Sequence, residues 1–174
     1  MAATAVILVD EQDRELGSME KIEAHEKALL HRAFSIFIFN AKGEMLLQKR
    51  ADTKYHSAGL WTNACCSHPA PGQATLAAAQ VRLQEEMGFT TTLSKAFTFI
   101  YKAPFGNGLT EYEYDHVFTG VYNGNIYPNP EEVSDWRYET IEAIEAGIQQ
   151  QPAAYTEWFK IAFPKLCQYP VSLH

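Results

Sequence analysis

Residues 69–89, PAPGQATLAAAQVRLQEEMGF, carry the clearest helix signal of the chain and indicate its fold class. Pro69 and Pro71 interrupt the preceding segment, and residues 74–87 then run without proline or glycine as far as Gly88, a residue typical of the position after a helix. Strand-like segments lie on both sides of this helix, and no repeat or low-complexity linker divides the chain. This order predicts an α/β or α+β fold in which helices flank a mixed β-sheet.

The segments around the helix predict the other elements. Apolar, β-branched and aromatic runs predict strands at residues 4–9, 34–39, 44–49, 90–102, 111–122 and 136–138. Ser18 is expected to cap a short polar helix, and two more helices are expected at residues 141–148 and 155–167. The run at residues 34–39 is apolar except for Ser35, which predicts a strand in the middle of the sheet.

Composition excludes several classes of partner. The 174 residues are the size of a single domain, which we expect to span residues 1–174. The net charge of −7 argues against nucleic acid or an anionic membrane as the main partner, since both require a basic surface. The number of cysteines, three, is odd, so we do not expect a disulfide framework. We expect a cytoplasmic location, where thiols stay reduced. We expect a monomer or a weak dimer.

Two groups of residues have the chemistry of metal ligands. His25 and His31 can converge only if the short helix ends between them, and either one alone is more often a surface or core histidine. Glu111, Glu113 and Asp115 share one face of a predicted strand, where three carboxylates repel one another unless water or a cation separates them. A solvated sheet face is the alternative. Imidazole and carboxylate ligands together suit zinc or manganese better than calcium.

The segment GLWTNACCSHP, residues 59–69, places a thiol beside an imidazole. Cys66 and His68 are two residues apart and are followed by a proline. A cysteine reacts as the thiolate, and a neighbouring cation or metal ion lowers the pKa of the thiol. The alternative is a buried cysteine pair with a capping histidine. Cys65 and Cys66 lack the two-residue gap of zinc ribbons.

The end of the central helix resembles the signature of Nudix pyrophosphohydrolases. In those enzymes, helix glutamates hold magnesium on a diphosphate. When Glu85, Glu86 and Gly88 are placed on that signature, Gln73 falls on its first glutamate and Arg82 replaces a helix carboxylate. A hydrolase needs several carboxylates to hold metal ions and orient water. The resemblance therefore implies a Nudix-like fold but argues against hydrolysis.

Four stretches together resemble the type I, flavin-independent isopentenyl-diphosphate Δ-isomerases, a Nudix-like family. They are Glu20-Lys21-x3-His25-x5-His31, Trp61-Thr62-Asn63-x2-Cys66-x-His68-Pro69, Glu86-Met87-Gly88 and Glu111-Tyr112-Glu113. The resemblance extends from about Val6 to Trp158. It implies a metal-dependent isomerase that interconverts isopentenyl diphosphate and dimethylallyl diphosphate by protonation and deprotonation through a tertiary carbocation.

The resemblance also implies a role for individual residues. The metal ligands implied are His25, His31, His68, Glu111 and Glu113. Glu86 and the backbone carbonyl of Cys66 would hold a magnesium ion that also binds the diphosphate. The site formed by the three histidines and two glutamates would hold zinc or manganese. Diphosphate contacts are implied for Lys21, Arg50, Lys54 and Arg82, and Trp158 would face the hydrocarbon. Glu113 with Tyr101 would protonate the double bond, and Cys66 would remove the second proton.

Two other functions are open at this point. A Nudix hydrolase of nucleoside diphosphates is the nearest enzyme, although Gln73 and Arg82 count against it. A binding module with a structural zinc ion and no turnover would have a site closed by four protein ligands. A flavin or nicotinamide enzyme is disfavoured, because no G-x-G-x-x-G follows a strand.

Overall fold

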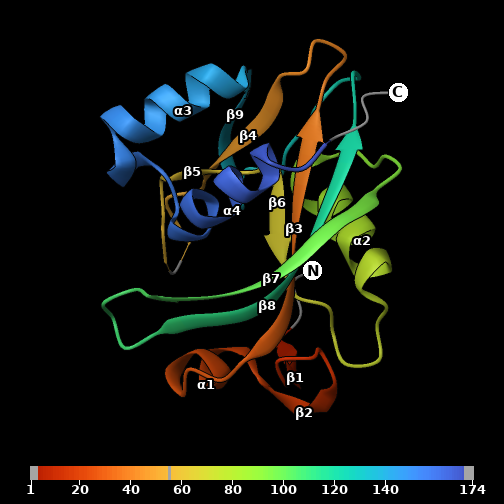
Figure 1. Cartoon of the computed structure of the whole chain (residues 1–174), viewed down its shortest axis with the longest axis vertical. Helices are drawn as coiled ribbons and strands as arrows, with labels where there is room; N and C mark the ends of the chain where they lie inside the picture. The colour runs from red at the N-terminus through yellow and green to blue at the C-terminus, as the bar shows by residue number, and fades with distance from the viewer. Residues whose placement is uncertain (1–3, 55, 171–174) are drawn as a thin grey trace.

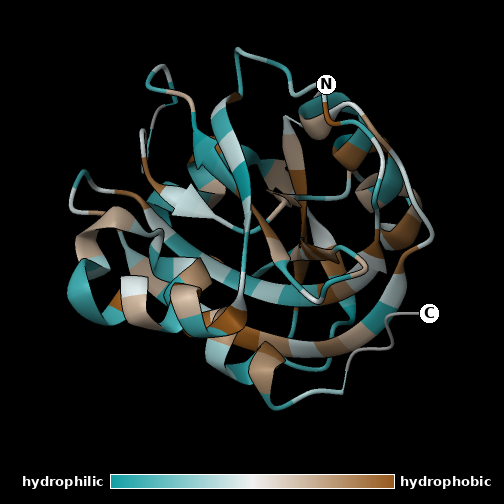
Figure 2. Ribbon diagram, turned by 90° about the horizontal axis from the view of Figure 1, so that it is seen from above, coloured by the Kyte–Doolittle hydropathy of each residue, from teal (hydrophilic) through white to brown (hydrophobic). Residues whose placement is uncertain are grey.

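The computed structural model describes residues 4–54 and 56–170, which form a nine-stranded mixed sheet with helices on both faces (Figure 1). Helix α2 (Thr75–Met87) covers one face, and helices α3 (Ile141–Gln150) and α4 (Glu157–Cys167) lie on the other (Figure 1). The ribbon is most hydrophobic where the inner strands meet the helices (Figure 2). The predicted architecture is confirmed.

Strand β3 (His31–Phe39) is the centre of the sheet, as its apolar run predicts. It pairs in parallel with β8 (Thr110–Val121) along its whole length and antiparallel with β6 (Cys65–Ser67). The turn that follows β3 leads into β4 (Met45–Arg50), but the two strands pair only at Phe39 and Met45. The two strands therefore diverge directly after the turn, and β4 pairs instead with β5 (Trp61–Thr62) and β9 (Val133–Glu139).

The N-terminal segment differs from its prediction. Ser18 does not cap a helix but lies in strand β2 (Glu15–Glu20), opposite Ile7 of β1 (Ala5–Val9). Helix α1 (Lys21–Glu26) begins only where that strand ends, and its cap is Glu20, whose side chain accepts a hydrogen bond from the Glu23 N–H at 2.9 Å. The pairing of β2 with β1 uses the backbone around Ser18, which the sequence pattern did not reveal.

The helix predicted before Gly88 is present as α2, and Gly88 ends it in the left-handed conformation, with φ 75°. A Cβ atom at Gly88 would lie 2.1 Å from the carbonyl oxygen of Tyr127, so glycine is required there by space as well as by conformation. Strand β7 (Ser94–Pro104), which lies in the predicted strand region at residues 90–102, then forms an antiparallel hairpin with β8.

The C-terminal part places α4 over the sheet. A short 3-10 turn, Pro152–Ala154, separates α3 from α4, and Thr156 caps α4. Phe159 and Phe163 of α4 pack on the face of the sheet opposite α2. None of the helices within the described ranges has both the length and the apolar composition of a membrane-spanning segment.

Candidate active site

Four side chains from distant segments meet at one end of the central strands. His25 ends α1, His31 begins β3, His68 follows β6, and Glu113 lies on β8; one ligand atom from each lies within 4.8 Å of the others. The sheet register explains the meeting, because His31 is directly opposite Glu113 and the antiparallel pairing of β6 with residues 34–36 of β3 directs the chain after β6 toward His31. The predicted helix end between His25 and His31 is what allows the two rings to face each other, with centroids 4.9 Å apart.

The two innermost histidines are oriented as metal ligands. Nδ1 of His25 hydrogen bonds to the carbonyl of Lys21 at 2.6 Å, and Nδ1 of His31 to the carbonyl of Leu29 at 2.8 Å. A carbonyl accepts, so each Nδ1 carries the proton and each Nε2 presents a lone pair. Both Nε2 atoms are buried without a hydrogen-bond partner, which is costly unless a cation satisfies them. These residues therefore fit a divalent metal ion.

Charge in this cluster is divided between Glu113 and the histidines. His68 Nε2 lies 3.0 Å from Glu113 Oε1, and His31 Nε2 lies 3.7 Å from the same oxygen. Burial raises the pKa of Glu113, but the polar contacts with His31 and His68 outweigh it and hold that pKa below its usual range. Burial lowers the pKa of His68 to about 4. A carboxylate together with imidazoles is the ligand set that zinc or manganese prefers.

Glu111 lies outside this four-residue group and faces Tyr101 instead. The Tyr101 hydroxyl hydrogen bonds to Glu111 and, at 2.7 Å, to Oε2 of Glu113. Burial, and next the charge of Glu113, raise the pKa of Glu111 well above its usual value. The hydroxyl has only one proton to donate, so a protonated Glu111 is needed to satisfy both carboxyl groups. Glu111, Tyr101 and Glu113 thus form a line of hydrogen bonds along which a proton can pass.

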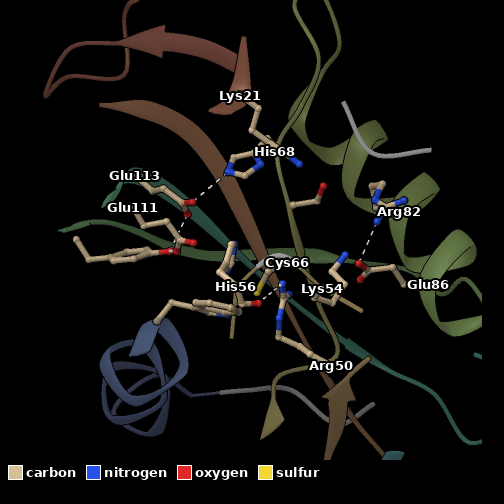
Figure 3. A pocket seen from close by; sticks show the side chains of 13 residues that line it. Lys21, Arg50, Lys54, His56, Cys66, His68, Arg82, Glu86, Glu111 and Glu113 are labelled. Carbon is tan, nitrogen blue, oxygen red and sulfur yellow. Dashed lines mark hydrogen bonds and ion pairs between the residues drawn. The ribbon is translucent and has the colours of Figure 1, made fainter. Parts of the chain in front are cut away.

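His68, Tyr101, Glu111 and Glu113 line a cavity, and Cys66 lines the same cavity, as Figure 3 shows. Successive residues of a strand point to opposite faces, so Cys65 packs against the α2 side and Cys66 faces the cavity. Burial, and next the charge of Asp115, raise the pKa of the Cys66 thiol. Among the charges of the described residues, that of Asp115 has the largest effect on the pKa of this thiol.

Basic side chains line the opposite part of the cavity: Lys21, Arg50, Lys54 and Arg82 (Figure 3). Burial, and next the charges of Lys54 and Arg82, lower the pKa of Lys21. Cations crowded in this way favour an anionic ligand between them. Glu86 shares this region, and Arg82 pairs with it at 3.0 Å.

Arg82 is tied to more than one carboxylate. Besides Glu86 it contacts Glu85 at 2.5 Å and Glu132 at 2.8 Å, and only 6% of its surface is exposed. It therefore places a positive charge among the helix carboxylates, so this helix offers fewer free carboxylates than a hydrolase needs to hold several metal ions and orient water.

An aromatic wall closes the cavity. Trp158 of α4 lines it, and Arg50 lies 5.2 Å from the ring centroid. His56 meets Trp158 edge to face at 5.8 Å and stacks on Phe105 at 4.6 Å. Burial, and next the charge of Arg50, lower the pKa of His56 to about 3, so its ring is neutral. Sequence reasoning missed His56 and Phe105, because each lies in a loop without a motif; the one signal was that His56 follows two predicted diphosphate contacts.

Comparison with known proteins places these observations in a family. The NUDIX domain family profile matches residues 29–159. The isopentenyl-diphosphate Delta-isomerase of Pectobacterium atrosepticum is 48% identical over 169 residues, which cover 97% of this chain and 94% of the relative. The isopentenyl-diphosphate Delta-isomerase 2 of Photorhabdus laumondii is 54% identical over 155 residues, which cover 89% of this chain and 88% of the relative.

Solved structures show the same fold. A Deinococcus radiodurans protein superposes with a TM-score of 0.74 at 18% identity, covering 90% of this chain and 96% of that one. A MutT protein from Methanosarcina mazei superposes with a TM-score of 0.66 at 17% identity, covering 80% of this chain and 94% of that one.

Proposed function

This chain belongs to the Nudix family and, within it, to the isopentenyl-diphosphate Delta-isomerases, and we infer that it interconverts isopentenyl diphosphate and dimethylallyl diphosphate. The observation that carries this function is the meeting of His25, His31, His68 and Glu113 beside a buried thiol. The isomerase predicted from the sequence is thereby confirmed at the level of the family. Arg82, held among three carboxylates, argues against the hydrolase alternative.

The substrate defines what the residues must do. An isolated alkene is a feeble base, and its protonation creates a tertiary carbocation that water would quench. The site must therefore add a proton to one carbon, remove a proton from another, and exclude water between the two steps. The buried cavity between the Glu113 side and Cys66 has the required form, because proton-handling groups reach it from different strands.

We assign protonation of the double bond to Glu113 with Tyr101, and removal of the second proton to Cys66, which would accept it as the thiolate, the form that bound metal ions would favour. Tyr101 supports this assignment because it contacts both carboxyl groups: the Tyr101 hydroxyl can pass its proton to Glu113 and take one from Glu111, and Glu113 then delivers the proton to the double bond. In the reverse reaction the groups exchange roles, and the thiol is the donor. Trp158, which lines the cavity, would face the cation with its ring, an interaction worth about 2 kcal/mol when desolvated.

The remaining residues hold the diphosphate and the metal ions. Lys21, Arg50, Lys54 and Arg82 would contact the phosphate oxygens. Zinc or manganese would be held by His25, His31, His68 and Glu113, and Glu111 would join them as a ligand only after it has passed its proton to Tyr101. Magnesium would be held by Glu86 and the Cys66 carbonyl. When bound, these ions neutralise the diphosphate, hold Glu113 in place and lower the pKa of nearby acids and thiols.

Incubation of the pure protein with isopentenyl diphosphate and magnesium in D2O tests the function. Proton NMR is expected to show dimethylallyl diphosphate with deuterium incorporated from the solvent. Release of inorganic phosphate or pyrophosphate from a panel of nucleotides, without isomerisation, would instead identify a hydrolase. Absence of both activities together with a metal ion that cannot be removed without unfolding would identify a structural zinc module.

A further inference from the structure

Two residues of the stretch before Cys66 have no part in the chemistry above and yet are buried. Thr62 is 2% exposed and Asn63 is fully buried. Both carry polar side chains, and burying such groups is unfavourable unless each finds hydrogen-bond partners. The partners of these two residues lead to the reactive sulfur.

Asn63 can present only its oxygen to Cys66. Its Nδ2 donates one hydrogen to the Ile36 carbonyl at 2.9 Å and the other to the Cys65 carbonyl at 3.1 Å. Exchanging the amide nitrogen and oxygen would turn an acceptor toward two carbonyl oxygens, which is repulsive. Oδ1 is therefore the atom that faces Cys66, and the thiol donates to it with an S–O distance of 3.2 Å.

The same oxygen is linked to the start of α4. Thr62 donates its hydroxyl hydrogen to Asn63 Oδ1 at 2.9 Å, and Thr156 donates to Thr62 at 3.1 Å. Thr156 also caps α4, accepting from the Phe159 N–H at 3.3 Å, and its own N–H donates to the Trp61 carbonyl at 3.0 Å. A continuous chain of buried hydrogen bonds thus joins the sulfur to the helix that carries Trp158, and bonds in such a chain strengthen one another.

A second fixed acceptor lies on the other side of the sulfur. Ser35 Oγ is 3.5 Å from Cys66 Sγ, and its hydrogen is donated to Asp115 at 2.6 Å. Because that hydrogen is used, Ser35 also presents lone pairs to the thiol. The sulfur is held between two oxygens whose own partners prevent them from turning.

We propose that Asn63 is a positioning residue for Cys66, and that Thr62 and Thr156 hold it in register with α4 and Trp158. The proposal rests on the proposed function in that Cys66 handles a proton of the substrate. Proton transfer at carbon requires the sulfur at contact distance and in line with the C–H bond, and a displacement of about 1 Å can cost roughly 100-fold in rate. The chain of hydrogen bonds therefore fixes the distance across the cavity between the Cys66 sulfur and the ring of Trp158.

The matched variants Thr62→Val and Thr62→Ser test the proposal in the complete enzyme. Valine has the shape of threonine without the hydroxyl, whereas serine keeps the hydroxyl. We expect kcat for isopentenyl diphosphate to fall roughly 10- to 100-fold in Thr62→Val, with KM within about twofold of wild type, and Thr62→Ser to recover most of kcat. Unchanged kcat in Thr62→Val, or a loss confined to KM, would overturn it.

A spectroscopic test separates this proposal from the proposed function. In protein labelled with ¹³C at the cysteine Cβ atoms, Cys66 is expected to give one sharp NMR signal, which broadens or moves in Asn63→Ala because the thiol then samples several rotamers. The exposed Cys167 is the internal reference. An unchanged Cys66 signal would refute positioning. If Asn63→Ala does not fold, Thr62→Val answers the same question, and the comparison is valid even if the wild type shows no isomerase activity.

Discussion

The two oxygens of Glu113 have different surroundings. Oε1 is 3.0 Å from His68, on the side where the imidazoles converge, whereas Oε2 accepts a hydrogen bond from Tyr101 at 2.7 Å. One carboxyl group can therefore bind a metal ion through one oxygen and exchange a proton through the other. The geometry explains how a single side chain can serve both tasks.

Replacing either proton-handling group should remove turnover without removing binding. Cys66→Ala and Glu113→Gln are each expected to lower kcat by roughly 10²- to 10⁴-fold, the usual contribution of a positioned acid or base. Calorimetry is expected to show that both variants still bind pyrophosphate in the presence of magnesium, because the basic side chains are intact. Cys167→Ser, at an exposed position on α4, is the control and should retain activity. Near-normal isotope exchange in either variant would refute the assignment.

His56 makes stability depend on pH. Its pKa is lowered from 6.5 to about 3 by burial and by Arg50, so between these values the unfolded chain binds a proton that the folded chain does not. Stability from this residue is therefore complete above pH 6.5 and falls as the pH decreases toward 3. Between pH 7 and pH 5 the metal-free protein should lose at most about 2 kcal/mol of unfolding free energy through His56.

Urea unfolding of wild type and His56→Gln at both pH values, with a chelator present, measures this contribution. Between pH 7 and pH 5, the unfolding free energy of His56→Gln should fall by less than that of wild type, and the difference should equal the contribution of His56. An identical pH dependence in the two proteins would show that His56 does not titrate as described.

At the scale of elements, helix ends place the functional groups. The end of α1 lets His25 turn toward His31, and the last turn of α2 carries Glu86 next to the loop that follows β8. That loop is attached to the helix end, because the Asn129 N–H donates to the Glu86 carbonyl at 2.8 Å. Gly88 allows this attachment, since a side chain there would collide with Tyr127.

Gly88→Ala is expected to destabilise the protein by at least about 2 kcal/mol, through the left-handed conformation and the collision with Tyr127. Gly72→Ala is a matched control, because Gly72 has a similar φ of 80° but no atom lies within 4 Å of the position that its Cβ would take. The difference in urea midpoint between the two variants measures the collision alone. Equal destabilisation would mean that Tyr127 moves aside without cost.

At the scale of the whole molecule, an acidic protein encloses a basic cavity. The net charge is −7, yet cationic side chains gather from α1, from the loop after β4 and from α2. The metal-ligand cluster likewise joins α1, β3, β8 and the segment after β6. An ion bound there connects segments that are separated in the unfolded chain, so folding and metal binding should be coupled.

Zinc or manganese is therefore expected to stabilise the fold by about 2.7 kcal/mol at a concentration roughly 100 times its Kd. Thermal unfolding with and without a chelator, together with measurement of bound metal, tests this. His25→Ala should lose most of the stabilisation, whereas His116→Gln should keep it, because His116 contacts Asp13 rather than the cluster. The same response in both variants would contradict the site.

Local patterns in the sequence determined much of this protein. Helix α2 and its end at Gly88, the buried strand β3 and the alternation that puts Glu111, Glu113 and Asp115 on one face all follow from residues close together in the chain. The resemblance to one family identified the function and nearly every residue that lines the cavity. The four stretches contain the proposed metal ligands and Cys66, and the match along the rest of the chain supplied Arg50, Lys54, Arg82, Tyr101 and Trp158.

Only the tertiary structure decided which groups meet. The parallel register of β3 and β8 places Glu113, rather than Glu111, among the histidines and leaves Glu111 on Tyr101. Pairing with β1 drew Ser18 into a strand, and loop packing brought His56 onto Phe105. The raised pKa of Cys66 also depends on burial and on Asp115. Contacts of this kind join residues far apart in the chain, so their free energy is gained only once the sheet has assembled, and no local pattern contains it.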